Sequence, residues 1–211
     1  MSKNLVRRSA LGAVAGAAAL VLAACGSGDD ASTGHAGHGS SSSSSSASAS
    51  PSAAQSRHNA ADVTFATGMV PHHRQAVEMA DLAPSRAGST EVKKMAAEIK
   101  KAQAPEIRTL SGWLTSWGEP VPSEGAMDHS MHGDMSGMMT SSDMDSLKKA
   151  SGKAFDTAFL KMMIEHHKGA VEMARTEKAR GASPDARKMA DSVITSQTSE
   201  MSRMAALLGK D

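Results

Sequence analysis

The chain has little of what most globular domains and enzymes use. Its 211 residues include no tyrosine, one cysteine and only 2% aromatic residues. One cysteine cannot form a disulfide framework, and so few aromatic side chains leave little with which to build a substrate pocket. The formal net charge of +1 gives no support for nucleic-acid binding. Because no nucleophile–base pair, phosphate loop or cofactor fingerprint is evident either, we expect a binding protein and not an enzyme.

The first residues have the pattern of a bacterial lipoprotein signal peptide. Lys3, Arg7 and Arg8 precede an apolar run that ends in Leu-Ala-Ala-Cys at Cys25. This run is too short for a membrane-spanning helix, which needs about 20 apolar residues. We therefore expect residues 1–24 to be removed after export by the general or the twin-arginine route. Lipid on Cys25 would then anchor the protein to the membrane, outside the cytoplasm.

Two polar segments flank or interrupt the predicted folded part, residues 58–208. Residues 25–57, rich in serine and glycine, lack the apolar content needed for order and are predicted to be a disordered tether. Residues 119–145 show no helical period and are predicted to be a long loop. Tracts of methionine and histidine, as in this loop, suggest weak and multiple metal capture. The candidate ligands in the loop are Met127, His129, Met131, His132 and Met135.

The folded part is an internal duplication. The phrases MVPHHRQAVEMA at 69–80 and MIEHHKGAVEMA at 163–174 align at an offset of 94 residues, without a gap from residue 62 to residue 113 of the first copy. Each copy contains two patterns with apolar residues at spacings of three and four, which predicts a helical hairpin. One hairpin cannot bury its apolar stripe, so we expect two hairpins to pack as an all-α, ferritin-like four-helix bundle. The predicted repeats are 58–118 and 146–208.

Polar residues interrupt these stripes. In the first copy, His72 lies on the stripe of the first helix, level with Gln103 on the second. The second helix has the stripe Val92, Ala96, Ile99, Gln103, Glu106, Leu110, Trp113 and Trp117. The equivalent polar positions of the second copy are His166, Gln197 and Glu200. An unpaired buried polar group costs a few kcal/mol, so these groups need one another or a metal. His73 and His167 lie about 100° to the side, where they could reach a neighbouring helix or solvent.

Two interpretations of this polar layer are favoured, and two further ones are weaker. Imidazole and thioether together favour copper, especially Cu(I), over magnesium or calcium. Alternatively, the layer only fixes helix register, as in an envelope structural or protein-interaction module. A ferritin-like carboxylate di-metal centre requires Glu-X-X-His, which the chain lacks, and a metal-dependent oxidase is a weaker idea.

The segments FATGMVPHHRQAVEMA and FLKMMIEHHKGAVEMA resemble the repeated signature of the domain of unknown function 305 family, secreted bacterial proteins of ferritin-like four-helix architecture. The resemblance implies a helical bundle outside the cytoplasm and, for some members, copper binding linked to copper tolerance. The ligands it implies by motif position are Met69, His72, His73, Met79, Met163, His166, His167 and Met173. The closed hairpins bring Gln103, Glu106, Gln197 and Glu200 to the same level, so these four are predicted as secondary groups. We therefore expect an extracytoplasmic copper-binding lipoprotein that sequesters or transfers copper.

Overall fold

The computed structural model describes residues 58–123 and 137–209, all of which belong to one structural unit, Ser48–Asp211. Its elements are the helices α1 (Ala60–Arg86), α2 (Thr90–Trp117), α3 (Ser141–Lys149), α4 (Gly152–Arg180) and α5 (Pro184–Leu208). The all-α fold with four long helices is therefore confirmed. None of the described helices combines the length and the apolar character that crossing a membrane requires.

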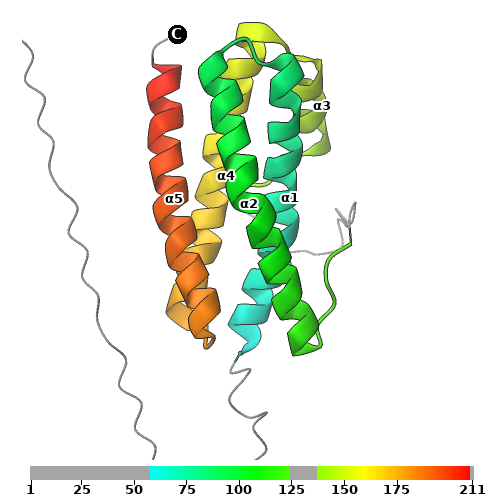
Figure 1. Cartoon of the computed structure of the whole chain (residues 1–211), viewed down its shortest axis with the longest axis vertical. Helices are drawn as coiled ribbons and strands as arrows, with labels where there is room; N and C mark the ends of the chain where they lie inside the picture. Colours follow the sequence, from blue (N-terminus) through cyan, green and yellow to red (C-terminus); the bar gives the residue numbers. More distant parts are fainter. Residues whose placement is uncertain (1–57, 124–136, 210–211) are drawn as a thin grey trace, which may run out of the picture. The chain divides into compact units, whose positions relative to one another are not determined.

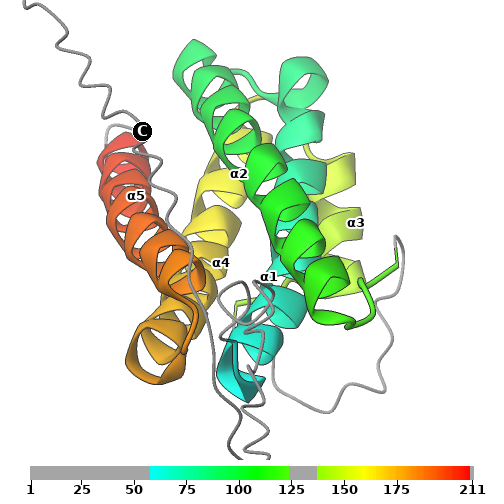
Figure 2. The same ribbon diagram turned by 60° about the horizontal axis from the view of Figure 1, so that its bottom comes forward.

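The four long helices form two hairpins that meet through α1 and α4. Helix α1 packs against α2, α4 packs against α5, and α1 packs against α4 (Figure 1). Helix α2 covers α1 and helix α5 covers α4, so α2 and α5 face each other, and Figure 2 shows them separated along part of their length. The short helix α3 contacts both α1 and α4.

Two aspartates, one in each repeat, bind the turn of the other repeat and so set the orientation of the hairpins. Asp62, at the start of α1, accepts hydrogen bonds from the backbone N–H groups of residues 182–183 in the turn before α5, at 3.0 and 2.9 Å. Asp156, at the start of α4, accepts from residues 88–89 in the turn before α2, at 3.1 and 2.8 Å. Each repeat thus holds the turn of the other, which requires α1 and α4 to be antiparallel.

Helix α3 corrects the prediction that residues 119–145 are entirely loop. Thr140 and Asp143 form a capping box, in which the threonine oxygen accepts from the Asp143 N–H at 3.1 Å and the aspartate accepts from the Thr140 N–H at 2.9 Å. Met144 and Leu147 bury the inner side of this helix against the bundle. A cap and two apolar side chains are enough for a helix that has a ready surface to pack on. Residues 124–136 of the predicted loop lie outside the described residues.

The core consists of two apolar clusters. The Phe155 cluster contains Ala76, Met79, Ala80 and Ala83 of α1, Ala87 after it, Val92, Met95, Ala96 and Ile99 of α2, Phe155, Phe159, Leu160 and Met163 of α4 and Met204 of α5, together with Met144 and Leu147 of α3. The Phe65 cluster contains Phe65 to Val70 of α1, Leu110 and Leu114 of α2, Ala170 and Ala174 of α4, and Ala190 and Val193 of α5. On each long helix, buried histidine or glutamine lies between the residues of the two clusters.

The end of α2 departs from the predicted stripe. Leu114 is buried, whereas Trp113 and Trp117 are only partly buried and pack against the Phe65 cluster. The two indole rings stack at a centroid distance of 6.0 Å, and Trp117 also stacks on His58 at 4.7 Å. A strict heptad drifts around a straight helix, so the inward position shifts by one residue over this length.

Candidate metal centre

The centre of the bundle is a pair of histidines, one from each repeat. His72 of α1 and His166 of α4 are fully buried, with ring centroids 3.8 Å apart and planes inclined by 38°. Burial, followed by charge repulsion from the neighbouring histidines, holds the pKa of His166 well below its ordinary value of 6.5. His166 is therefore neutral at physiological pH, which is the form of imidazole that binds metals.

The second histidine of each motif is paired with a carboxylate of the neighbouring helix. His73 Nε2 lies 2.8 Å from Glu106 Oε2, and His167 Nε2 lies 2.7 Å from Glu200 Oε2. Both imidazoles are fully buried, so the prediction that they could lie at the solvent is wrong, while the alternative that they reach a neighbouring helix holds. We call His73 and His167 the outer histidines and His72 and His166 the inner ones. The outer histidines pair with the glutamates because their side of α1 and α4 faces α2 and α5.

The remaining nitrogen of each outer histidine is available for a ligand. Within the described residues, Nδ1 of His73 and Nδ1 of His167 are buried and have no hydrogen-bond partner. When Nε2–H donates to the glutamate, Nδ1 carries a lone pair. Metal-bound histidines usually have this arrangement, since a carboxylate on one nitrogen orients the ring and makes the other nitrogen more basic.

Two glutamines add further buried polar atoms to this layer. Gln103 of α2 and Gln197 of α5 are 2% and 3% exposed. In the described part of the chain, neither the amide nitrogen nor the oxygen of Gln103 has a hydrogen-bond partner, and the oxygen of Gln197 has none. Such groups cost about 1–3 kcal/mol each when left unsatisfied, and a buried water or an ion is the usual remedy.

The methionines of one motif do not lie together. Met79 and Met163 belong to the Phe155 cluster, whereas Met69 belongs to the Phe65 cluster, against which Met173 packs. Of these four motif methionines, each cluster therefore combines one from each repeat, and the histidines lie between the two pairs along the chain. No group of three or more histidine, aspartate or glutamate side chains in the two described ranges could hold a metal ion. A metal in this layer would need thioether or amide ligands besides imidazole.

The linker between the repeats is attached at the level of the histidines. Gln75 donates to the Met139 carbonyl at 2.9 Å and accepts from the Met139 N–H at 2.7 Å. Gly137 has φ +83° and lies so close to α4 that a Cβ there would meet the Glu165 and His166 carbonyls. Gly169 occupies the position in the second repeat that Gln75 has in the first. The two copies thus differ at this position because one linker contacts both.

The loop and lipid predictions concern other parts of the chain. Cys25 and the loop candidates Met127, His129, Met131, His132 and Met135 lie outside the described residues.

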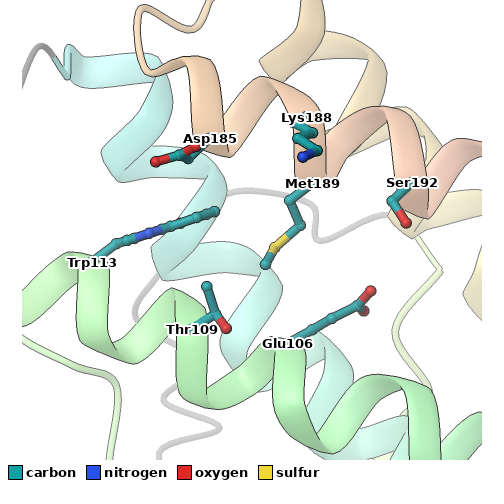
Figure 3. A pocket seen from close by; sticks show the side chains of 7 residues that line it. All are labelled: Glu106, Thr109, Trp113, Asp185, Lys188, Met189 and Ser192. Carbon is teal, nitrogen blue, oxygen red and sulfur yellow. The ribbon is translucent and has the colours of Figure 1, made fainter. Parts of the chain in front are cut away.

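A groove beside Glu106 was not predicted. It is lined by Glu106, Thr109 and Trp113 of α2 and by Asp185, Lys188, Met189 and Ser192 of α5 (Figure 3). The Met189 side chain points from α5 toward Thr109 and Glu106. Glu106 belongs both to this groove and to the buried pair with His73, so it connects the surface with the polar layer. The sequence signal for this groove was that Met189 is equivalent to Met95 at the repeat offset. The sequence does not show that the Met189 side chain lies in a surface groove.

Comparisons with known proteins agree with this architecture. The family described as "Domain of unknown function (DUF305)" matches residues 62–208. A DUF305 protein of Streptomyces coelicolor, described as a candidate secreted protein, is 35% identical, with 71% of this chain and 93% of that chain covered and a TM-score of 0.65. CopM in the Cu(II)-bound form is also 35% identical, with coverages of 71% and 96% and a TM-score of 0.61. A DUF305 fragment from Deinococcus radiodurans is 27% identical, with coverages of 73% and 99% and a TM-score of 0.65. No curated protein matches the chain.

Proposed function

Since the chain belongs to the DUF305 family, we propose that it is an extracytoplasmic copper-binding lipoprotein that sequesters or transfers copper. One observation carries the proposal. Two fully buried histidines, His73 and His167, each have one ring nitrogen on a glutamate and the other without a partner among the described residues. A carboxylate on one ring nitrogen and no partner on the other is the arrangement of a histidine prepared for a metal.

The surrounding donors favour a soft metal. His166 is neutral, and buried or partly buried methionines of both repeats lie on each side of the histidine layer along the helices. Imidazole and thioether ligands suit Cu(I), whereas the carboxylate-rich shells that magnesium and calcium require are lacking in the described residues. In this proposal His72, His73, His166 and His167 are the first ligands to consider, with Met69, Met79, Met163 and Met173 as thioether donors.

The relatives support copper as the cargo. CopM has been solved in Cu(II)-bound, Cu(I)-bound and silver-bound forms. At 31 to 35% identity over 71% of this chain, CopM is similar enough for the same class of cargo to be proposed here. The signal-peptide pattern and Cys25 place the protein at the outer side of the membrane in this proposal, and the methionines and histidines of residues 127–135 provide a weaker capture segment.

The register module is the competing function, and a specific observation favours it. The bonds of His73 to Glu106 and of His167 to Glu200 join the helices of each hairpin, so they fix register whether or not a metal binds. The two functions differ in what happens to metal affinity when these bonds are weakened. If the bonds only fix register, weakening them lowers the stability of the fold and leaves metal affinity unchanged. If the histidines bind metal, weakening the bonds lowers both stability and metal affinity.

The test is a Cu(I) titration of the purified chain against a competing chelator. Glu106→Gln with Glu200→Gln keeps the size of both side chains and removes the carboxylates that orient the histidines. We expect the tightest copper affinity to fall about 10- to 100-fold in this variant. Alanine at all four motif histidines should abolish the tightest site, while His58→Ala, which removes a histidine outside the motif, should leave it unchanged. Unchanged affinity in the four-histidine variant, with helical content retained, would reject these histidines as the copper site in favour of the register module.

A further inference from the structure

The two halves of the space between α2 and α5 are related by the duplication. The offset of 94 residues relates each residue of the Glu106 groove to one on the opposite half. The equivalent pairs are Glu106 and Glu200, Thr109 and Arg203, Trp113 and Leu207, Asp185 and Glu91, Lys188 and Lys94, Met189 and Met95, and Ser192 and Glu98. Each half contains one glutamate bound to a buried outer histidine, so the chemistry behind both halves is the same.

The halves differ in one bridge. Arg203 of α5 donates to Glu98 of α2 at 2.7 Å, across the half that contains Glu200. Thr109 and Ser192 occupy the equivalent positions, and both line the Glu106 groove. A threonine and a serine are too short to span the same gap, and neither is charged. One half is therefore spanned by an ion pair and the other is not.

The exposure of the paired residues follows this difference. The Glu106 side chain is 22% exposed and that of Glu200 is 14% exposed. Met189 is partly buried, whereas Met95 is only 2% exposed. Each half has one more carboxylate than cationic side chains, counted over the pairs named above. The two halves therefore have the same formal charge and should attract a cation equally. They differ in how accessible their glutamate is, and the ion pair causes that difference.

We propose that the Glu106 groove is the port through which a soft monovalent cation reaches the buried histidines, and that the Glu98–Arg203 ion pair closes the equivalent half. The port rests on the proposed copper function. Its donors suit such an ion, because Met189 provides a thioether, Trp113 an aromatic face and Glu106 a carboxylate. From Glu106, the next group inward is His73.

The duplication supplies matched variants for the test. Thr109→Arg with Ser192→Glu transplants the bridge to the open half, and Arg203→Thr with Glu98→Ser removes it from the closed half. Thr109, Ser192 and Arg203 are exposed and Glu98 is partly so, so both variants should fold, and circular dichroism checks this. The chain has two tryptophans, so Trp117→Phe in every variant leaves Trp113, in the port, as the only fluorescent reporter.

The first readout is the rate at which Ag(I) quenches Trp113 fluorescence in the full chain. We expect the transplanted bridge to slow quenching about three- to fivefold, because the ion pair must open before Ag(I) enters and a surface ion pair is weak. The equilibrium affinity for Ag(I) should be unchanged. Removing the native bridge should leave this rate unchanged. Equal rates in all variants that bind Ag(I) tightly would overturn the port and leave the copper function standing.

The second readout needs no metal. Hydrogen–deuterium exchange at the imidazole Cε1, followed by mass spectrometry, reports water access to each outer histidine. We expect His73 to exchange faster than His167, and the order to reverse when both pairs of substitutions are combined. Equal exchange at the two histidines would overturn the port, whether or not the chain binds Ag(I). Absence of Ag(I) binding in every variant would separately refute the copper function.

Discussion

Replacing Glu177 with glutamine should stabilise the protein above pH 8 and change its stability little near pH 5. Glu177 of α4 is 1% exposed. Burial, followed by the hydrogen bond to Asp62 and the negative charge of Asp62, raises the pKa of Glu177 from 4.5 to about 8. At neutral pH the carboxyl is mostly protonated and can donate to Asp62, as a glutamine amide also can.

The sign of the pH dependence follows from proton linkage. The folded-state pKa of Glu177 lies above the unfolded value, so the native state binds more protons between pH 4.5 and pH 8. The free energy of unfolding therefore falls as pH rises through this window and levels off above it. At about 1.4 kcal/mol per pH unit the loss would reach about 5 kcal/mol. Relaxation of the pair and water penetration reduce this, and we expect about 2–4 kcal/mol.

The assay is urea unfolding followed by circular dichroism at a series of pH values from 5 to 9. The native chain should lose stability across the series, and Glu177→Gln should lose much less. The first repeat has no buried carboxyl at the equivalent place, because it has Ala83 and Ala87 where the second repeat has Glu177 and Gly181. A Cβ at Gly181 would meet both the Glu177 carboxyl and the Glu177 backbone carbonyl, so Gly181→Ala should destabilise the native chain more than it destabilises a Glu177→Ala variant. Parallel pH profiles for the native chain and Glu177→Gln would refute the raised pKa of Glu177.

Two further predictions concern the contacts between the repeats and the linker. Asp62→Asn and Asp156→Asn should each lower the free energy of unfolding by about 1–3 kcal/mol in urea titrations at pH 7, since an amide group then faces a buried N–H; no loss in either variant would contradict the exchange of turn contacts between repeats. Gly137→Ala should raise amide hydrogen exchange at Met139, whose N–H bonds to Gln75, because the left-handed backbone and the lack of space both oppose a side chain at Gly137. Gln75→Ala should have the same effect, and protection of Met139 retained in both variants would contradict the docking.

The duplication and the long helices could be predicted because both are properties of the linear sequence. A constant offset needs only alignment, and the spacing of apolar residues reports helical period directly. Helix α3 was missed because nine residues with two buried apolar side chains carry too weak a period to separate them from a loop. Its stability depends on the α1 and α4 surface beneath Met144 and Leu147, which no local pattern shows.

The polar layer shows the same division more sharply. The level of His72, His166, Gln103 and Gln197 along the bundle was predictable, since residues at equal distances from a turn meet when a hairpin closes. The partner of Glu106 was not, because a rotation of about 100° about the axis of α1 decides whether His72 or His73 faces α2.

Linear order was therefore sufficient for the two repeats, their helices and the height of the histidine layer. Packing alone decided that the hairpins cross antiparallel, that the outer histidines take the glutamates, and that one half of the α2–α5 groove is bridged. These depend on how whole helices rotate and approach one another. That choice is made by contacts between residues 33 to 121 positions apart, such as His73 with Glu106 and Asp62 with Ser183.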